Sequence, residues 1–313
     1  MIVCIASVIL ASCSHDKTSK TNDSKPLEFV FITTCVSEDF FIPVKKGMEE
    51  AASLLGVKCS FIGTEDVDLE QQVNMVREAV KTGVDGIALS IIDTLAFDVV
   101  VREAMDNGIP VVAFNVDDNK TPNARLSGIC QNLYKAGYDL GKHMAALIPD
   151  NSTILMTLHS RGISALDDRL KGQQDALAGK NITWEVVITG TDADTASVII
   201  ADALLNHPEI KYVLCTGQAD TEGAGIAVEK HFGNKGYLVA GFDLSPEILR
   251  LIKGGHILFT IDQQPYMQGF YPVIQLFQYC RYGLLPSDNE IVASVVDSSN
   301  AEEVEILCSK HYR

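Results

Sequence analysis

The residues of this sequence best suited to recognise a small molecule are carboxylates, amides and one arginine. Such groups accept or donate hydrogen bonds in pairs, which matches the vicinal hydroxyl groups of a polyhydroxylated ligand. Each of them comes after an apolar run in which a strand is expected. They are Glu38, Asn115, Asp117, Arg169, Asp243 and Gln263.

Each polar residue also has a purely structural explanation when it is considered alone. Asp243 could cap the next helix, and Asn115 could form a turn. Arg169 could pair with Asp167 or Asp168 in its own segment. Their joint occurrence at successive strand ends favours a binding site.

Catalytic and cofactor-binding motifs are absent from the chain. It contains no GxSxG, HExxH or GxxxxGK[ST] pattern, and Gly223-Ala224-Gly225 lacks the third glycine of a dinucleotide fingerprint. The six cysteines after residue 14 show no CxxC pair or zinc-ligand spacing, and we expect them to be unpaired. We therefore expect no enzymatic activity, no cofactor and no metal site.

The sequence alternates short β-rich apolar runs with longer segments of helical period, which is typical of βαβ units around mostly parallel sheets. One series of strands is expected at 29–32, 57–62, 86–90 and 111–114, and a second at 154–158, 183–188, 212–214, 237–242 and 257–261. Helices are expected at 44–55, 69–80, about 94–107, 133–148, 246–253 and 265–281, with others starting near 165, 195 and 221. Parallel sheets bind ligands at the carboxyl ends of their strands.

Composition and the first residues limit the class of protein. The 313 residues include 41 acidic and 25 basic side chains, and a net charge of -16 would repel the phosphate backbone of nucleic acids. Residues 1–12 are apolar but too short to span a membrane, which indicates a signal peptide. The run Leu10-Ala11-Ser12-Cys13 resembles the lipobox of bacterial lipoproteins, so we expect a lipid on Cys13 and a polar tether over 13–26.

Longer stretches resemble the ribose- and galactose-type periplasmic binding proteins over nearly the whole chain after the tether. These are 37–48, 108–115, 165–172, 239–243 and 260–269. The resemblance implies that Phe40 and Phe41 present ring faces to a sugar, and that Asn115, Arg169, Asp243 and Gln263 bind its hydroxyls. Gln218 or Asp220 would occupy the remaining strand-end position.

The resemblance implies an α/β fold of two doubly wound parallel-sheet lobes joined by a three-segment hinge. The N-terminal lobe would comprise 27–130 and 264–292, and the C-terminal lobe 131–263 and 293–313. A monomer would close on a sugar or polyol in the periplasm or at the outer face of the cell membrane. It would touch the membrane only through its lipid and deliver the ligand to an ABC permease. The alternative is a sensor that presents its liganded form to a membrane receptor or kinase.

Overall fold

The computed structural model describes residues 25–93, 95–118, 121, 123–160, 164–233 and 236–313. The predicted signal peptide, Cys13 and nearly all of the predicted tether lie outside these residues. Within them, no helix combines the length and apolar character that crossing a membrane requires.

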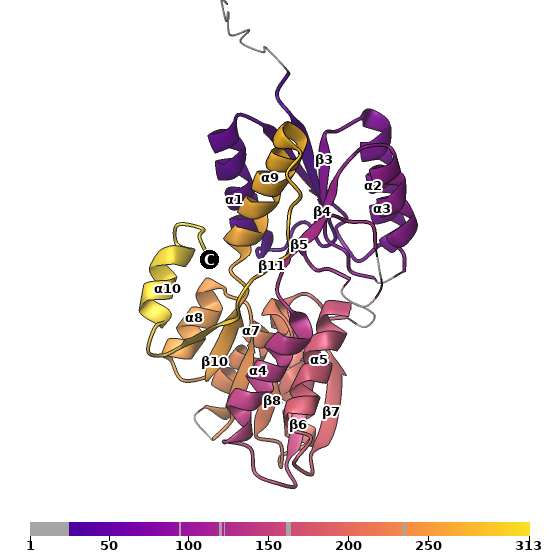
Figure 1. The fold of residues 1–313 in the computed structure, drawn as a ribbon. Coiled ribbons are helices and arrows are strands. Elements are labelled where there is room, and N and C mark those ends of the chain that lie inside the picture. The colour runs from indigo at the N-terminus through magenta and orange to yellow at the C-terminus, as the bar shows by residue number, and fades with distance from the viewer. Residues whose placement is uncertain (1–24, 94, 119–120, 122, 161–163, 234–235) are drawn as a thin grey trace, which may run out of the picture.

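The first lobe is built on a six-stranded parallel sheet with the order β11-β5-β4-β3-β1-β2 (Figure 1). Its central strands are continuous apolar runs because helices cover both faces of the sheet. The strands are β1 (Glu28–Thr33), β2 (Lys58–Gly63), β3 (Gly86–Leu89), β4 (Val111–Asn115), β5 (Ser127–Cys130) and β11 (Asn289–Glu290).

Two pairs of helices cover this sheet. The helices are α1 (Phe41–Leu55), α2 (Leu69–Thr82), α3 (Asp98–Asp106) and α9 (Pro265–Tyr282). α1 packs against α9, and α2 packs against α3 (Figure 1). Glycines allow the backbones of α1 and α9 to touch: a Cβ atom on Gly269 would lie 1.9 Å from the carbonyl oxygen of Val44. α9 therefore belongs to the first lobe although most of the second lobe precedes it in sequence.

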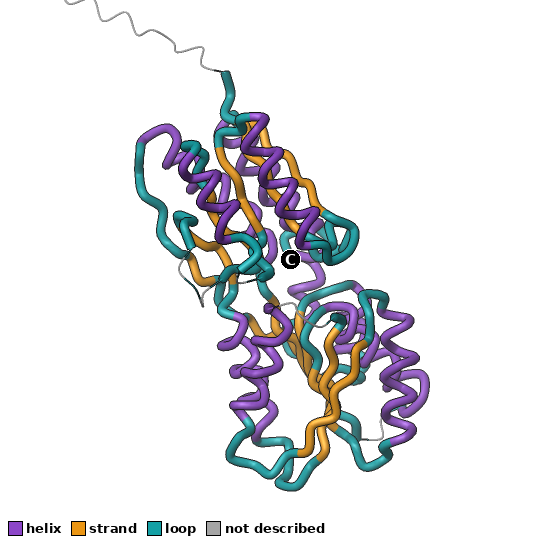
Figure 2. The backbone as a smooth tube through the Cα atoms, turned by 90° about the vertical axis from the view of Figure 1, so that its right-hand side faces the viewer, coloured by secondary structure: helices purple, strands orange, loops and turns teal. Residues whose placement is uncertain are grey.

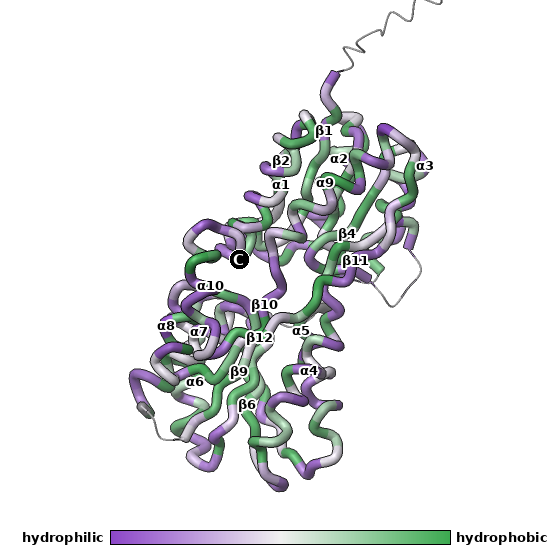
Figure 3. Tube along the Cα trace, turned by 60° about the vertical axis from the view of Figure 1, so that its left-hand side comes forward, coloured by the Kyte–Doolittle hydropathy of each residue, from purple (hydrophilic) through white to green (hydrophobic). Residues whose placement is uncertain are grey.

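The second lobe contains a six-stranded sheet with the order β12-β10-β9-β8-β6-β7, in which only β12 is antiparallel to its neighbour. Its strands are β6 (Thr153–Leu158), β7 (Thr183–Ile188), β8 (Tyr212–Leu214), β9 (Leu238–Phe242), β10 (Phe259–Asp262) and β12 (Ser294–Asp297). Its helices are α4 (Leu133–Ala145), α5 (Ser164–Ala176), α6 (Ala193–Asn206), α7 (Gln218–Ala227), α8 (Pro246–Lys253) and α10 (Ala301–Cys308), with a π-helical turn at Val228–Phe232. Many of the strands stand out as hydrophobic inside both lobes (Figure 3).

The chain passes between the two lobes at three places: after β5, after β10, and between β11 and β12. The lobes lie one above the other, and these connecting segments run between them (Figures 1 and 2). The predicted fold of two doubly wound lobes with a three-segment hinge is confirmed. All six described cysteines are unpaired, as the sequence predicts.

Candidate functional site

A cavity of about 470 Å³ lies between the lobes, at the carboxyl ends of their strands. This volume falls in the range of small-molecule sites. Both lobes and the hinge contribute to its wall. Eight of the predicted site residues line it: Glu38, Phe40, Phe41, Asn115, Arg169, Gln218, Asp243 and Gln263.

Arg169 is buried and charged, and its guanidinium makes several contacts with the second lobe and the hinge. Its Nη1 donates to the carbonyl oxygen of Thr216 at 2.8 Å, and its Nη2 donates to Oε1 of Gln131 at 3.3 Å. Its guanidinium lies over the ring of Phe242, 4.0 Å from the centroid. Burial lowers the pKa of Arg169, and the charge of Asp243 partly offsets this effect. Its Nε is buried and has no hydrogen-bond partner in the described part of the chain.

Asp243 lies directly after β9 in a left-handed conformation, with φ of +70°. Its Oδ1 accepts from Nε2 of Gln263 at 2.5 Å, and its Oδ2 lies 3.9 Å from Nη1 of Arg169. Burial raises the pKa of Asp243, while Arg169 and Gln263 act to lower it. Oε1 of Gln263 is buried and has no hydrogen-bond partner among the described residues. Arg169 and Gln263 both line the cleft, and each therefore keeps one buried polar group that its described neighbours leave unpaired.

The first lobe contributes an amide and aromatic rings. Asn115 ends β4 with φ of +64°, and its Oδ1 accepts from the hydroxyl of Ser90 at 3.2 Å. Phe41 is 4% exposed and packs in the core of the lobe, whereas Phe40 is half-buried. The two rings meet edge to face at 5.2 Å. Phe40 is thus the ring with more surface available to a ligand, and Phe41 supports it.

Glu38 gives the cleft an unusual charge. Burial, and then the negative charge of Asp243 in the opposite lobe, raise the pKa of Glu38 to about 7. No lysine, arginine or histidine in the described part of the chain forms an ion pair with it. The cleft is lined by six carboxylates, of which Glu38 and Asp243 are two, and among the described residues Arg169 is its only lysine or arginine.

Two residues that the sequence predicted for the site, Asp117 and Asp220, are not among the described residues that line the cleft, whereas Gln218, the alternative to Asp220, is. Asp117 is turned toward Arg125, whose Nε donates to its Oδ1 at 2.6 Å. Asp220 is fully buried behind the cleft wall and accepts from the hydroxyl of Thr157 at 2.6 Å. Its carboxylate also accepts from the backbone N–H of Gly217 at 2.9 Å, at the start of α7. Both carboxylates are occupied by structural contacts.

Several residues of the cleft were not predicted from the sequence, and His159 and Glu222 are two titratable ones. His159 lies directly after β6, so the rule that strand ends form the site would have found it. Burial, and then the charge of Arg169, lower the pKa of His159 to about 4, so it is neutral near pH 7. Glu222 lies in α7 and accepts from the hydroxyl of Ser245 at 2.5 Å. Nothing in its sequence context distinguishes it from a surface residue.

The sequence profile of a family described as the periplasmic binding protein domain matches residues 29–283. The chain therefore belongs to the periplasmic binding protein family. The proteins of this family bind ligands outside the cytoplasm, which confirms the predictions that the chain is a binding protein, not an enzyme, and is extracytoplasmic.

Three known binding proteins illustrate the similarity. The xylose/arabinose-binding protein of Sulfolobus acidocaldarius is 32% identical, over 80% of this chain and 66% of that protein. The ribose import binding protein of Bacillus subtilis is 24% identical, over 86% and 88% of the two chains. A solute-binding protein of Burkholderia graminis, solved in complex with D-arabinose, superposes with a TM-score of 0.82 at 25% identity, over 89% of this chain and 97% of that one.

Proposed function

We propose that this chain is a lipid-anchored receptor that binds a neutral monosaccharide in the interlobe cleft and delivers it to an ABC permease. The observation that carries the proposal is the buried group formed by Arg169, Asp243 and Gln263. All three residues line the cavity, and Nε of Arg169 and Oε1 of Gln263 are buried polar atoms without a hydrogen-bond partner among the described residues. Phe40 adds an aromatic face on the opposite lobe.

The charge of the cleft and the names of the relatives limit the range of candidate ligands. Among the described residues of the cleft, carboxylates outnumber the single guanidinium of Arg169, and this excess of acidic groups would disfavour sugar acids and sugar phosphates. One relative is named for xylose and arabinose, and a similar structure contains D-arabinose. Neutral pentoses are therefore the first candidates, and neutral hexoses come next.

The test is a thermal-shift screen of the purified full chain carrying Cys13→Ser, which prevents lipidation. The screen compares D-xylose, D- and L-arabinose, D-ribose, D-galactose and D-glucuronate. A ligand at 100 times its dissociation constant stabilises a protein by about 2.7 kcal/mol, so a true ligand gives a clear upward shift. We expect a shift with at least one neutral sugar and none with glucuronate. The proposal would be contradicted if none of the neutral sugars raised the melting temperature.

Two arginine variants test whether a sugar that gives a shift binds in the cleft. Arg169→Lys keeps the positive charge but cannot reproduce the planar fork of donors, so it should remove the shift. Arg77→Lys is the matched control, because Arg77 is exposed and pairs with Glu103 at 3.2 Å on the outside of the first lobe. An intact shift in Arg169→Lys would place the sugar elsewhere.

Delivery and sensing use the same cleft and differ in the protein that the liganded form contacts next. Deleting the gene should abolish uptake of the labelled sugar if the protein serves a permease. Intact uptake with loss of sugar-induced transcription would instead support the sensor hypothesis.

A further inference from the structure

The segment after α10, residues 309–313, connects the two lobes without being one of the three chain crossings. It starts on the second lobe, where α10 packs against α8 and β12. Glu305 of α10 accepts from Lys253 at 2.7 Å, and Val304 is part of the hydrophobic core of that lobe. α10 must therefore move with the second lobe.

The far end of this segment lies on the first lobe. The ring of Tyr312 meets the ring of Tyr266 edge to face, with centroids 5.1 Å apart. The ammonium of Lys46 lies 4.9 Å from the centroid of the Tyr312 ring. Lys46 belongs to α1 and Tyr266 to α9, the two helices that are packed closely in the first lobe.

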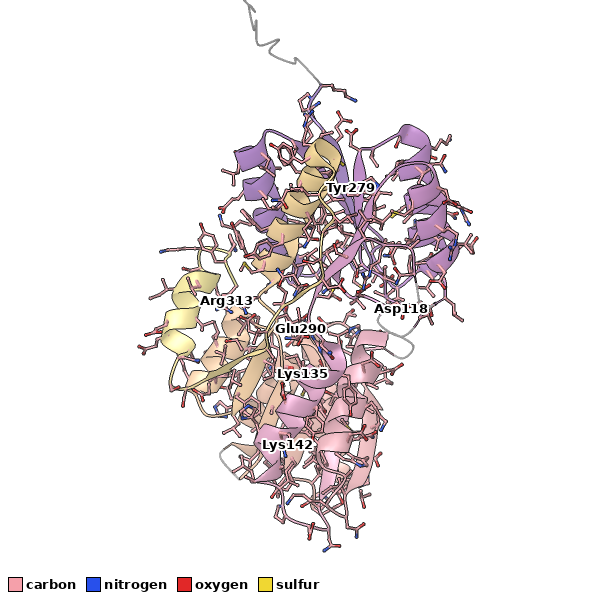
Figure 4. All side chains as sticks on the ribbon, viewed as in Figure 1. Asp118, Lys135, Lys142, Tyr279, Glu290 and Arg313 are labelled. Carbon is pink, nitrogen blue, oxygen red and sulfur yellow. The ribbon has the colours of Figure 1, made fainter. Side chains whose placement is uncertain are left out.

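The segment is also fixed beside the hinge. The guanidinium of Arg313 forms an ion pair with Asp262, the last residue of β10, whose side chain is 1% exposed. His311 has φ of +56°, and the backbone N–H of Tyr312 donates to the carbonyl oxygen of Leu307 at 3.0 Å, so the chain turns back from α10. Arg313 lies at the level where the two lobes meet (Figure 4).

The space beside this segment is not filled by other side chains. A cavity of about 310 Å³ lies there, bounded by Phe40 and Ile42 of the first lobe and by Leu244 and Leu249 of the second. His311 and Arg313 complete its wall. The contacts of Tyr312 therefore bridge a loosely packed part of the lobe interface.

We propose that residues 309–313 form a latch that holds the lobes in the arrangement seen here, with Tyr312 as a positioning residue for ligand binding. Tyr312 is absent from the lining of the cleft. Its partners Lys46 and Tyr266 move with one lobe, and α10 moves with the other. A movement of the lobes that separates Tyr312 from Lys46 and Tyr266 would break the contact, so the contact stabilises the arrangement seen here, in which residues of both lobes line one cleft. Stabilising an arrangement that binds the ligand raises the apparent affinity.

The test compares Tyr312→Ala with the unmodified sequence, both carrying Cys13→Ser. An edge-to-face aromatic pair together with a cation–π contact predicts an affinity for the best sugar of the screen that is weaker on the order of tenfold. Small-angle scattering should show a larger radius of gyration for Tyr312→Ala at subsaturating sugar. Tyr282→Ala is the matched control, because Tyr282 is 67% exposed at the end of α9.

Two further measurements separate the latch from general damage to the fold. Tyr312→Phe keeps the ring and should keep the affinity. The effects of Lys46→Ala and Tyr312→Ala on affinity should be non-additive in the double variant, because each substitution alone already removes the contact between Lys46 and Tyr312. Equal affinity and equal radius of gyration for Tyr312→Ala and the unmodified sequence would overturn the latch.

The affinity readout rests on the proposed sugar binding, whereas the scattering readout does not. If no sugar binds, the proposed function fails. The latch is then judged by scattering of the unliganded proteins alone. A larger radius of gyration for Tyr312→Ala supports it, and an unchanged radius overturns it.

Discussion

Gln263 donates a hydrogen bond of 2.5 Å from its Nε2 to Oδ1 of Asp243. The bond joins the first residue of the β10–α9 hinge segment to a carboxylate at the carboxyl end of β9. Through its carbonyl oxygen, Gln263 also accepts from Nε2 of Gln268 in α9 at 2.9 Å. The same residue therefore contacts the ligand cleft and both lobes.

We predict that Gln263→Leu weakens sugar binding at least tenfold. The substitution removes the unpaired Oε1 and leaves Asp243 without its amide donor, and a hydrogen bond to a charged group contributes about 1.5–3 kcal/mol. Isothermal titration with the best sugar of the screen measures the loss. Gln275→Leu, which removes an amide of α9 outside the cleft, should bind normally. Unchanged affinity in Gln263→Leu would exclude Gln263 from the site.

We predict that Glu38 makes the unliganded protein less stable as the pH rises from 5 to 7. Its pKa is about 7 in the folded protein, against an ordinary value of 4.5 for a glutamate. Between these values the folded state binds more protons than the unfolded state, so the free energy of unfolding falls as the pH rises. The loss of stability caused by Glu38 is absent below pH 4.5 and complete above pH 7.

The measurement is the melting temperature at about pH 5 and about pH 7.5 for the wild type and Glu38→Gln. Other buried carboxylates also titrate, so the difference between the two proteins isolates Glu38. The melting temperature of Glu38→Gln should fall less over this interval. Glu49→Gln, on the solvent-exposed side of α1, serves as the control and should behave as the wild type does. Identical pH profiles for Glu38→Gln and the wild type would show that Glu38 is not perturbed.

We predict that Gly269→Ala destabilises the first lobe by about 1–3 kcal/mol, the usual cost of overpacking. Its Cβ would lie 1.9 Å from the carbonyl oxygen of Val44, so α1 and α9 would have to separate. Urea unfolding measures the change. Gly179→Ala is the control, because a Cβ there meets no atom within 4 Å. Equal midpoints of urea unfolding for Gly269→Ala and Gly179→Ala would mean that the close contact between α1 and α9 does not contribute to stability.

We predict that Cys13→Ala releases the protein from membranes. The lipid expected on Cys13 is the only anchor that the sequence indicates. Fractionation of bacterial cells that express the full gene compares the wild type with the variant, and Cys35→Ala is the control. Recovery of the wild type in the soluble fraction alone would refute lipid anchoring.

The main elements could be predicted because their signals are strong and local. The predicted helix 246–253 coincides with α8 (Pro246–Lys253), since Pro246 favours the first turn and the hydroxyl of Ser245 accepts from the N–H of Ile248 at 3.0 Å. The strands predicted at 183–188 and 212–214 also match β7 and β8. A continuous apolar run between such signals is compatible with few other assignments of secondary structure.

The elements that were missed are short and lack a local pattern. β5 (Ser127–Cys130) contains serine and glycine, and β11 (Asn289–Glu290) consists of two polar residues at the edge of its sheet. α10 (Ala301–Cys308) has only eight residues. These segments are defined by the elements that they pack against, which a single sequence does not reveal.

The site residues were predicted from their positions after expected strands. Whether each of them lines the cleft depends on the direction of its side chain. Gln218 and Asp220 are two residues apart at the start of α7, yet only Gln218 lines the cleft. The carboxylate of Asp220 turns back to accept backbone N–H groups at the start of the helix. Asn115 has positive φ, and Asp117, two residues later, contacts Arg125 instead of the cleft.

The order of the strands has a consequence for how the two lobes are related. β1, β2, β3, β4 and β5 occupy the same places in their sheet as β6, β7, β8, β9 and β10 do in the other. By this correspondence, Asn115 at the end of β4 is equivalent to Asp243 just after β9, and both have positive φ. The two lobes therefore repeat one structural unit with the same strand order. The cleft therefore has the same backbone feature on both sides, one from each repeat, with an amide in the first lobe and a carboxylate in the second.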